Sequence, residues 1–208
     1  MRGQTTFAAA VLNLVLAGTA MSQAPALEQM VPDARLGTRV APLLLLGRPD
    51  VRVDLGLSPE QEARARDAIA DLYARALASR GKVGREALAA RREIDEAQVR
   101  SLDNLLDETQ RTRLDQIDLQ WEGPAALVLR RGLAEHLELN QAQRDALTTA
   151  IARRNDQRRS GPPYEADQVL AHEALGVLNP PQRSLWRAML GRPFTPEVAQ
   201  TTPRATRR

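Results

Sequence analysis

The side chains that could do metal or acid–base chemistry are few and widely separated in this sequence. The only histidines are His136 and His172. Glu173 follows His172, as in zinc-binding His-Glu-x-x-His helices, but Gly176 stands where the second histidine is required. Cysteine is absent, which excludes disulfides, thiol nucleophiles and thiolate metal sites. We therefore predict no metal ion, no cofactor and no catalytic nucleophile.

Carboxylates are the remaining candidates for catalysis. They gather in two clusters, Glu93, Asp95 and Glu96, and then Asp103, Asp107 and Glu108. Two carboxylates held about 5–10 Å apart in a cleft could hydrolyse a glycosidic bond, so a hydrolase of envelope polymers stays open as an alternative. Arginines interleave with both clusters, however, and such mixtures are typical of a solvated helix face. The favoured interpretation is a protein that is not an enzyme.

The elements that carry these residues are predicted to be helices. Aromatic residues make up only 3% of the chain, whereas alanine, leucine, arginine and glutamate are strong helix formers. The 29 basic and 26 acidic residues give a net charge of only +3, and Lys82 is the only lysine. Because arginine raises the pI without creating a large net charge, the composition does not predict a nucleic-acid partner. We expect an all-α fold with no sheet.

Four short segments share one spacing, in which leucine is followed by Ser, Asp or Asn and, three residues later, by glutamine. The polar residue fits a helix N-cap, and the glutamine side chain can accept from the cap's own backbone N–H, which closes a capping box. A proline at the first helical position, as in two of the segments, supports the same prediction. These predicted structural motifs are Leu57-Ser58-x-x-Gln61, Leu106-Asp107-x-x-Gln110, Leu139-Asn140-x-x-Gln143 and Leu178-Asn179-x-x-Gln182.

Each motif opens an apolar stripe at helical spacing. The leucines are expected to be buried, and eight residues after them stand Ala65, Leu114, Leu147 and Trp186. Trp121 and Trp186 follow the second and fourth motifs, and we expect them to fill equivalent places in the core. An exposed tryptophan pair would instead indicate binding anchors.

The motifs pair into a larger repeat. Residues 42–61 match residues 124–143 at a constant offset of 82, with Leu55 against Leu137 and Gln61 against Gln143. This self-similarity predicts a tandem duplication of a helical-hairpin unit. The expected boundaries are 25–121 for the first unit, 122–193 for the second, and 194–208 for a disordered basic tail.

The N-terminus predicts export. Arg2, an apolar stretch from Phe7 to Ala17 and the small residues after it form the pattern of a secretory signal peptide over residues 1–24. Cleavage is expected between Ala20 and Ala24. No later segment reaches the length of a membrane span, so we expect a soluble periplasmic or secreted protein.

The four motifs and their helices resemble the periplasmic LTxxQ-motif (Spy/CpxP-like) helical family, as a tandem-duplicated divergent member. The nearest stretch runs from Ala174 to Trp186, although Ser58, Asp107, Asn140 and Asn179 replace the family's threonine. The resemblance implies a small helical-hairpin fold and a chaperone-like or envelope-stress role.

The resulting functional expectation is an exported protein that binds unfolded or envelope proteins, with an oligomeric state that the sequence does not indicate. An envelope scaffold without chaperone activity is the other alternative. A rim of arginines is the predicted client-binding surface, formed by Arg153, Arg154, Arg158 and Arg159. These arginines can also complement the dipole at the C-terminal end of a helix.

Overall fold

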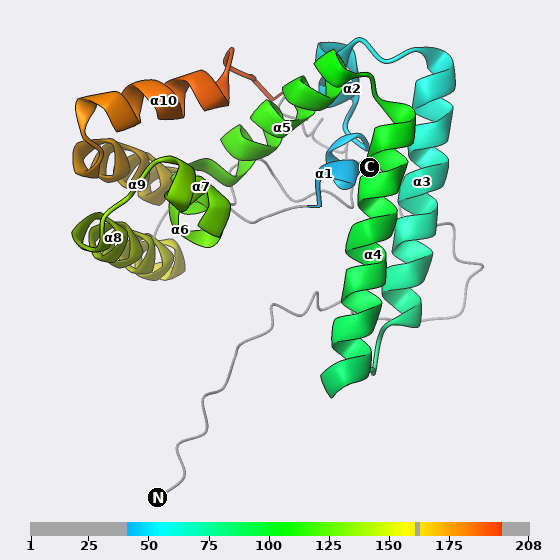
Figure 1. Cartoon of the computed structure of the whole chain (residues 1–208), viewed down its shortest axis with the longest axis horizontal. Helices are drawn as coiled ribbons and strands as arrows, with labels where there is room; N and C mark the ends of the chain where they lie inside the picture. Colours follow the sequence, from blue (N-terminus) through cyan, green and yellow to red (C-terminus); the bar gives the residue numbers. More distant parts are fainter. Residues whose placement is uncertain (1–40, 161–162, 197–208) are drawn as a thin grey trace, which may run out of the picture.

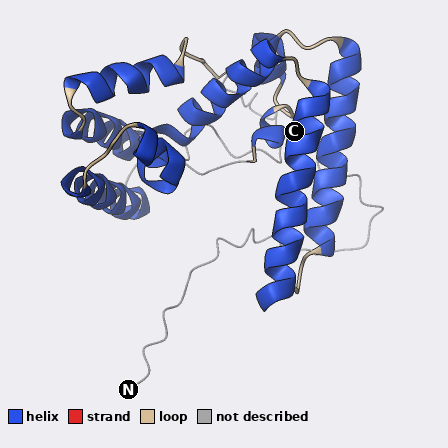
Figure 2. Cartoon of the chain, viewed as in Figure 1, coloured by secondary structure: helices blue, strands red, loops and turns tan. Residues whose placement is uncertain are grey.

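The computed structural model describes residues 41–160 and 163–196, and every regular element in these ranges is a helix (Figures 1 and 2). The predicted all-α fold is confirmed. The predicted signal peptide and most of the predicted tail lie outside the described residues. No described helix is long and apolar enough to cross a membrane.

The first part of the chain builds a projecting pair of long helices. Two short helices lead into this antiparallel pair, and a fifth helix runs from its base toward the rest of the molecule (Figure 1). Their bounds are α1 Pro42–Leu45, α2 Pro49–Leu55, α3 Pro59–Ala78, α4 Gly84–Leu105 and α5 Glu108–Glu122. We call the α3–α4 pair the arm. Its tip is turned away from the other described helices.

The second part is a more compact cluster. After a 3-10 turn at Gly123–Ala125 the helices are α6 Ala126–Leu129, α7 Arg131–His136, α8 Gln141–Ser160, α9 Pro163–Val177 and α10 Pro180–Leu190. Helices α8 and α9 lie side by side, and α10 packs on α5. The helix starts at Pro59, Glu108, Gln141 and Pro180 agree with the starts predicted from the motifs. The duplication itself remains a prediction.

Two hydrophobic clusters form the core, and α5 contributes to both. Leu114, Ile117 and Trp121 belong to the first cluster, whereas Leu119 belongs to the second. Both tryptophans are buried, so they are not exposed anchors. Trp121 belongs to the first cluster and Trp186 to the second, and the equivalence of their places stays a prediction. The two parts therefore share a helix, and a cut at residue 121 would fall within it.

The C-terminal segment folds back onto the first part. The Arg113 guanidinium donates to both carboxylate oxygens of Asp54, at 2.7 and 3.2 Å, and to the Arg192 carbonyl at 2.7 Å. Arg192 in turn donates to Asp54 at 2.7 Å. Phe194 packs against the first cluster and its N–H donates to Gln120. Residue 194 is thus part of the packed structure rather than the start of a separate tail.

Candidate functional site

All four predicted helix starts have the expected cap. The side chains of Ser58, Asp107, Asn140 and Asn179 each accept a hydrogen bond from the backbone N–H three residues later. The glutamine at that third position accepts from the cap's own N–H in every case. Reciprocal bonds of this kind satisfy two of the backbone donors that a helix start leaves unpaired. The capping-box prediction is confirmed.

The structure also brings the four glutamines together in two facing pairs. Gln61 donates to the Gln110 side-chain oxygen at 2.8 Å, and Gln110 donates back at 3.3 Å. Gln143 and Gln182 make the same exchange at 2.7 and 3.2 Å. Reciprocal side-chain hydrogen bonds therefore join the start of α3 to the start of α5, and the start of α8 to the start of α10.

The second N–H of each glutamine amide donates to a backbone carbonyl at the end of the helix that precedes the opposite motif. The acceptors are the carbonyls of Leu105, Leu55, Val177 and Leu137. Helix ends leave such carbonyls without an intrahelical partner. Each glutamine thus uses one oxygen to accept twice and one nitrogen to donate twice, which a glutamate could not do. This is a physical reason for glutamine at the third position.

The motif leucines follow the prediction with one exception. Leu106, Leu139 and Leu178 are buried, but Leu57 is only partly buried against the first cluster. The predicted stripe residues Ala65, Leu114, Leu147 and Trp186 are all buried. The twelve motif residues therefore build the helix junctions.

Of the four arginines predicted to form a rim, Arg154 is buried and Arg158 half-buried between α8 and α9, whereas Arg153 and Arg159 are exposed. Arg154 is buried and lies 3.5 Å from Asp167, which Arg158 also approaches at 3.5 Å. Arg153 pairs with Glu173 across the same two helices at the surface, and Arg159 lies near Asp156 of its own helix. The ion pairs of Arg153, Arg154 and Arg158 connect α8 to α9. Binding of a client by these arginines stays a prediction.

The other candidates for chemistry are exposed. His136 and His172 lie on the surface of α7 and α9, and the described residues hold no metal-type cluster of three His, Asp or Glu side chains. The six clustered carboxylates are exposed as well. Three of them have clear local roles, since Asp107 caps α5, Glu96 approaches Arg100 and Asp103 approaches Arg111.

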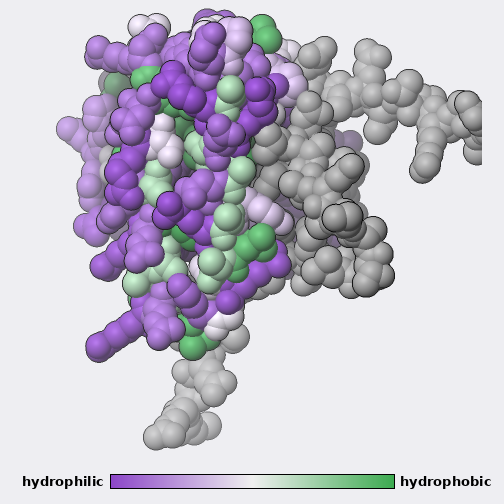
Figure 3. Space-filling view, turned by 90° about the vertical axis from the view of Figure 1, so that its right-hand side faces the viewer, coloured by the Kyte–Doolittle hydropathy of each residue, from purple (hydrophilic) through white to green (hydrophobic). Residues whose placement is uncertain are grey.

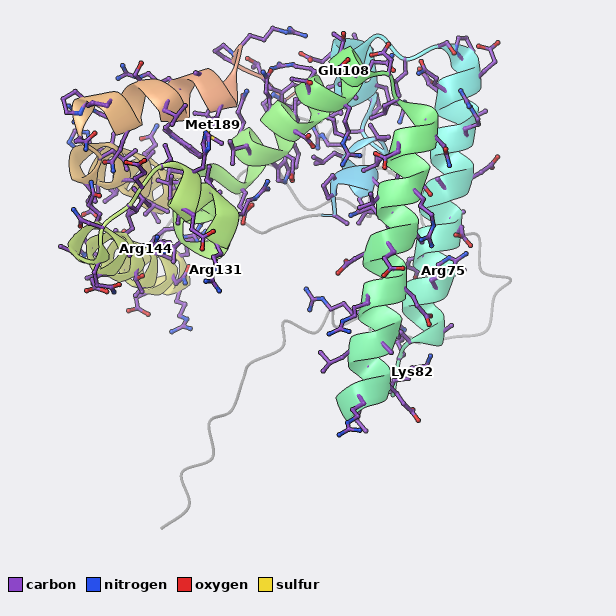
Figure 4. All side chains as sticks on the ribbon, in the orientation of Figure 1. Arg75, Lys82, Glu108, Arg131, Arg144 and Met189 are labelled. Atoms are coloured by element: carbon purple, nitrogen blue, oxygen red, sulfur yellow. The ribbon has the colours of Figure 1, made fainter. Side chains whose placement is uncertain are left out.

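A groove between α5, α7 and α10 is the surface feature that sequence reasoning missed. Its volume is about 900 Å³. Leu119 and Leu133 line it as buried residues, Met189 is half-buried on the side of α10 that faces α7, and Leu129 is 56% exposed (Figure 4). An aliphatic side chain so exposed beside buried apolar ones offers an apolar contact surface to a ligand.

Charged residues surround this apolar lining. Arg131 is largely exposed and pairs with Glu135, while Arg130 donates to Asp118 at 2.8 Å and to Glu122. Burial acts to lower the pKa of Arg130, but the two carboxylates outweigh it and raise that pKa. Desolvation also raises the pKa of Asp115 at the groove edge, against the attraction of Arg111 and Arg130. The groove thus combines an apolar lining with a polar, partly cationic border.

Comparison with known proteins identifies no relative: the sequence matches no family model, no curated protein and no solved structure.

Proposed function

We propose that this chain is an exported, non-enzymatic helical protein that binds other proteins, and that the groove between α5, α7 and α10 receives an apolar segment of the partner. The observation that carries the proposal is the exposure of Leu129 beside Leu119, Leu133 and Met189. Binding sites characteristically combine an apolar lining with a few polar groups at the border.

The border fits a partner that is held loosely. Arg131 has a side chain that is 90% exposed, and its pairing with Glu135 is a surface ion pair of small free energy. It is therefore available to an acidic group of a partner, and such contacts mainly speed the encounter and respond to salt. The resemblance of the helix starts to the LTxxQ-motif family supports the same class of function.

The test is aggregation of a chemically denatured reference protein, without ATP, at stoichiometric amounts of the mature chain. We expect suppression at low salt that weakens at high salt. The variant Leu129→Asp should require several-fold more protein for the same suppression, because it places a charge in the apolar lining. The matched control is Val169→Asp, which alters an exposed aliphatic residue of α9 outside the groove.

Two results would contradict the proposal. If the chain leaves aggregation unchanged at tenfold excess, a scaffold without chaperone activity becomes the better interpretation. If Leu129→Asp and Val169→Asp reduce suppression equally while both variants keep their helical circular dichroism, binding does not occur in the groove.

A further inference from the structure

The tip of the arm concentrates the positive charge of the protein. Residues 75–92 contain six basic residues and one acidic residue, Glu86, which gives a net charge of +5. The whole chain carries only +3, so all its other residues together are net negative. The arm root, residues 59–71 and 93–105, holds eight acidic and three basic residues. Charge is therefore separated along the arm.

The cations at the tip are not neutralised within the protein. In the part of the chain that the structure describes, ion pairs form along the arm root and at Arg75, which meets Asp71 at 2.7 Å. Five exposed tip cations form no ion pair with any described carboxylate: Arg80, Lys82, Arg85, Arg91 and Arg92. Most other arginines of the described residues do have one. The tip charge is therefore available to an external anion.

Aliphatic side chains are exposed at the same tip. Val83 is 79% exposed in the turn between the helices, Leu88 is 62% exposed on α4, and Leu77 is 38% exposed on α3. Lys82 marks this end of the arm in Figure 4, and hydrophobic atoms are visible among hydrophilic ones at the lower end of the face in Figure 3. Among residues 75–92, only Ala90 is buried. Cations thus surround apolar residues that no described helix covers.

We propose that the tip of the arm docks on an anionic lipid surface. Basic residues near such a surface are attracted to the headgroups, and adjacent aliphatic side chains enter the boundary with the acyl chains. The acidic root would be repelled by the same surface, so the charge separation would orient the arm with its tip toward the lipid. This surface is separate from the groove, and the proposal does not depend on protein binding there.

The experiment is co-sedimentation of the mature chain with vesicles of phosphatidylcholine alone or with one-third phosphatidylglycerol. We expect binding only to the anionic vesicles. The tip variant R80Q/K82Q/R85Q should lower the partition coefficient at least tenfold, because each cation contributes roughly fivefold at a charged surface. The matched control R66Q/R159Q/R187Q removes three exposed arginines elsewhere and should have a much smaller effect.

A fluorescence readout places the tip in the bilayer. Trp121 and Trp186 are buried, so a V83W variant adds an indole that brominated lipids should quench selectively. Equal losses in the tip variant and the control would overturn the proposal, as would absence of quenching in V83W.

The alternative partner of the basic tip is the acidic arm root of a second copy of the chain. If sedimentation shows a dimer that R80Q/K82Q/R85Q dissociates, while anionic vesicles do not bind the wild-type chain, the tip docks on protein rather than lipid.

Discussion

The two long helical hairpins of this protein are held together in different ways. The α8–α9 hairpin has three cross-helix ion pairs, from Arg153 to Glu173 and from both Arg154 and Arg158 to Asp167. The described residues of the arm have none between α3 and α4, and their pairs at i,i+4 lie within one helix. Ion pairs of that kind contribute little to stability. The charged side chains of the arm therefore stay accessible to solvent or a partner, whereas those of the α8–α9 hairpin form ion pairs between its two helices.

The glutamine pairs at the base of the two hairpins show the same contrast in burial. Their hydrogen-bond patterns match, but Gln182 is only 8% exposed, while Gln61, Gln110 and Gln143 are half-buried. The same substitution should therefore cost more stability at Gln182 than at Gln61. This difference gives the comparison its strongest test.

The largest expected effect is that of Gln182→Glu. The substitution replaces a donor by a carboxylate that faces the Leu137 carbonyl and the Gln143 side-chain oxygen. We expect a loss of about 2–4 kcal/mol in the free energy of unfolding at neutral pH. Urea unfolding measures it. Gln61→Glu is the matched control, with an expected loss of about half as much because water reaches that site.

The pH dependence of the same variant separates its causes. Burial should raise the pKa of the introduced carboxyl above the unfolded value of about 4.3. The loss should then be smallest below that pH, where the carboxyl is protonated and can donate, and should grow as the pH rises through the folded pKa. A loss that does not change with pH would contradict the proposed donor role of the glutamine.

These pairs show where sequence reasoning succeeds and where it stops. Capping is a local property, so Ser58, Asp107, Asn140 and Asn179 could be recognised from spacing alone. The exchange between Gln61 and Gln110 joins residues 49 positions apart, and no local pattern encodes it. Its only sequence signal was the preference for glutamine over glutamate at all four third positions.

The candidate sites were predicted less well for a related reason. The arginine run after Ile151 was predicted to be a surface rim, and Arg153 and Arg159 are exposed, but Arg154 and Arg158 lie against Asp167 of the next helix. Pairing between helices cannot be derived from either segment alone. The groove depends on the packing of α10 against α5, two helices far apart in the sequence. In contrast, the charge of residues 75–92 was present in the sequence, and the structure added that five of the six cations form no ion pair with a described carboxylate.

The second prediction tests whether the two parts correspond at the residue level. Gly56 and Glu138 are separated by the repeat offset of 82, and both have a left-handed backbone, with φ of 62° and 52°. A side chain at such a position costs roughly 1 kcal/mol. Glu138→Gly should therefore stabilise the protein by about 0.5–1 kcal/mol, and Gly56→Ala should destabilise it by about 1 kcal/mol. Thermal unfolding of both variants measures this.

A helical glycine supplies the control for that pair. Gly132 lies in α7, and an added Cβ there would meet no atom within 4 Å. Gly132→Ala should stabilise the protein slightly, by about 0.5–1 kcal/mol, since alanine favours a helix. Destabilisation by Glu138→Gly would show that the correspondence with Gly56 has no energetic meaning.

The smallest effect concerns the ion pairs that distinguish the second hairpin. Burial raises the pKa of Asp167 despite the attraction of Arg158 and Arg154, and burial likewise lowers the pKa of Arg154. Both directions indicate that desolvation exceeds the ionic attraction, as is common for buried pairs. The carboxyl of Asp167 therefore contributes stability below its unfolded pKa of about 3.9, and this contribution is lost as the pH rises through the higher folded pKa.

The measurement is the difference in unfolding free energy between the wild-type chain and Asp167→Asn, followed from pH 3.5 to pH 6.5, roughly the range in which an aspartate with a raised pKa titrates. We expect the difference to shift against the wild type as the pH rises, because only the wild type ionises at this position. If the difference instead moves in favour of the wild type with rising pH, the arginines stabilise the Asp167 carboxylate. The cross-helix ion pairs would then stabilise the contact of α8 with α9. The two hairpins would differ in how much their ion pairs contribute to the free energy of unfolding.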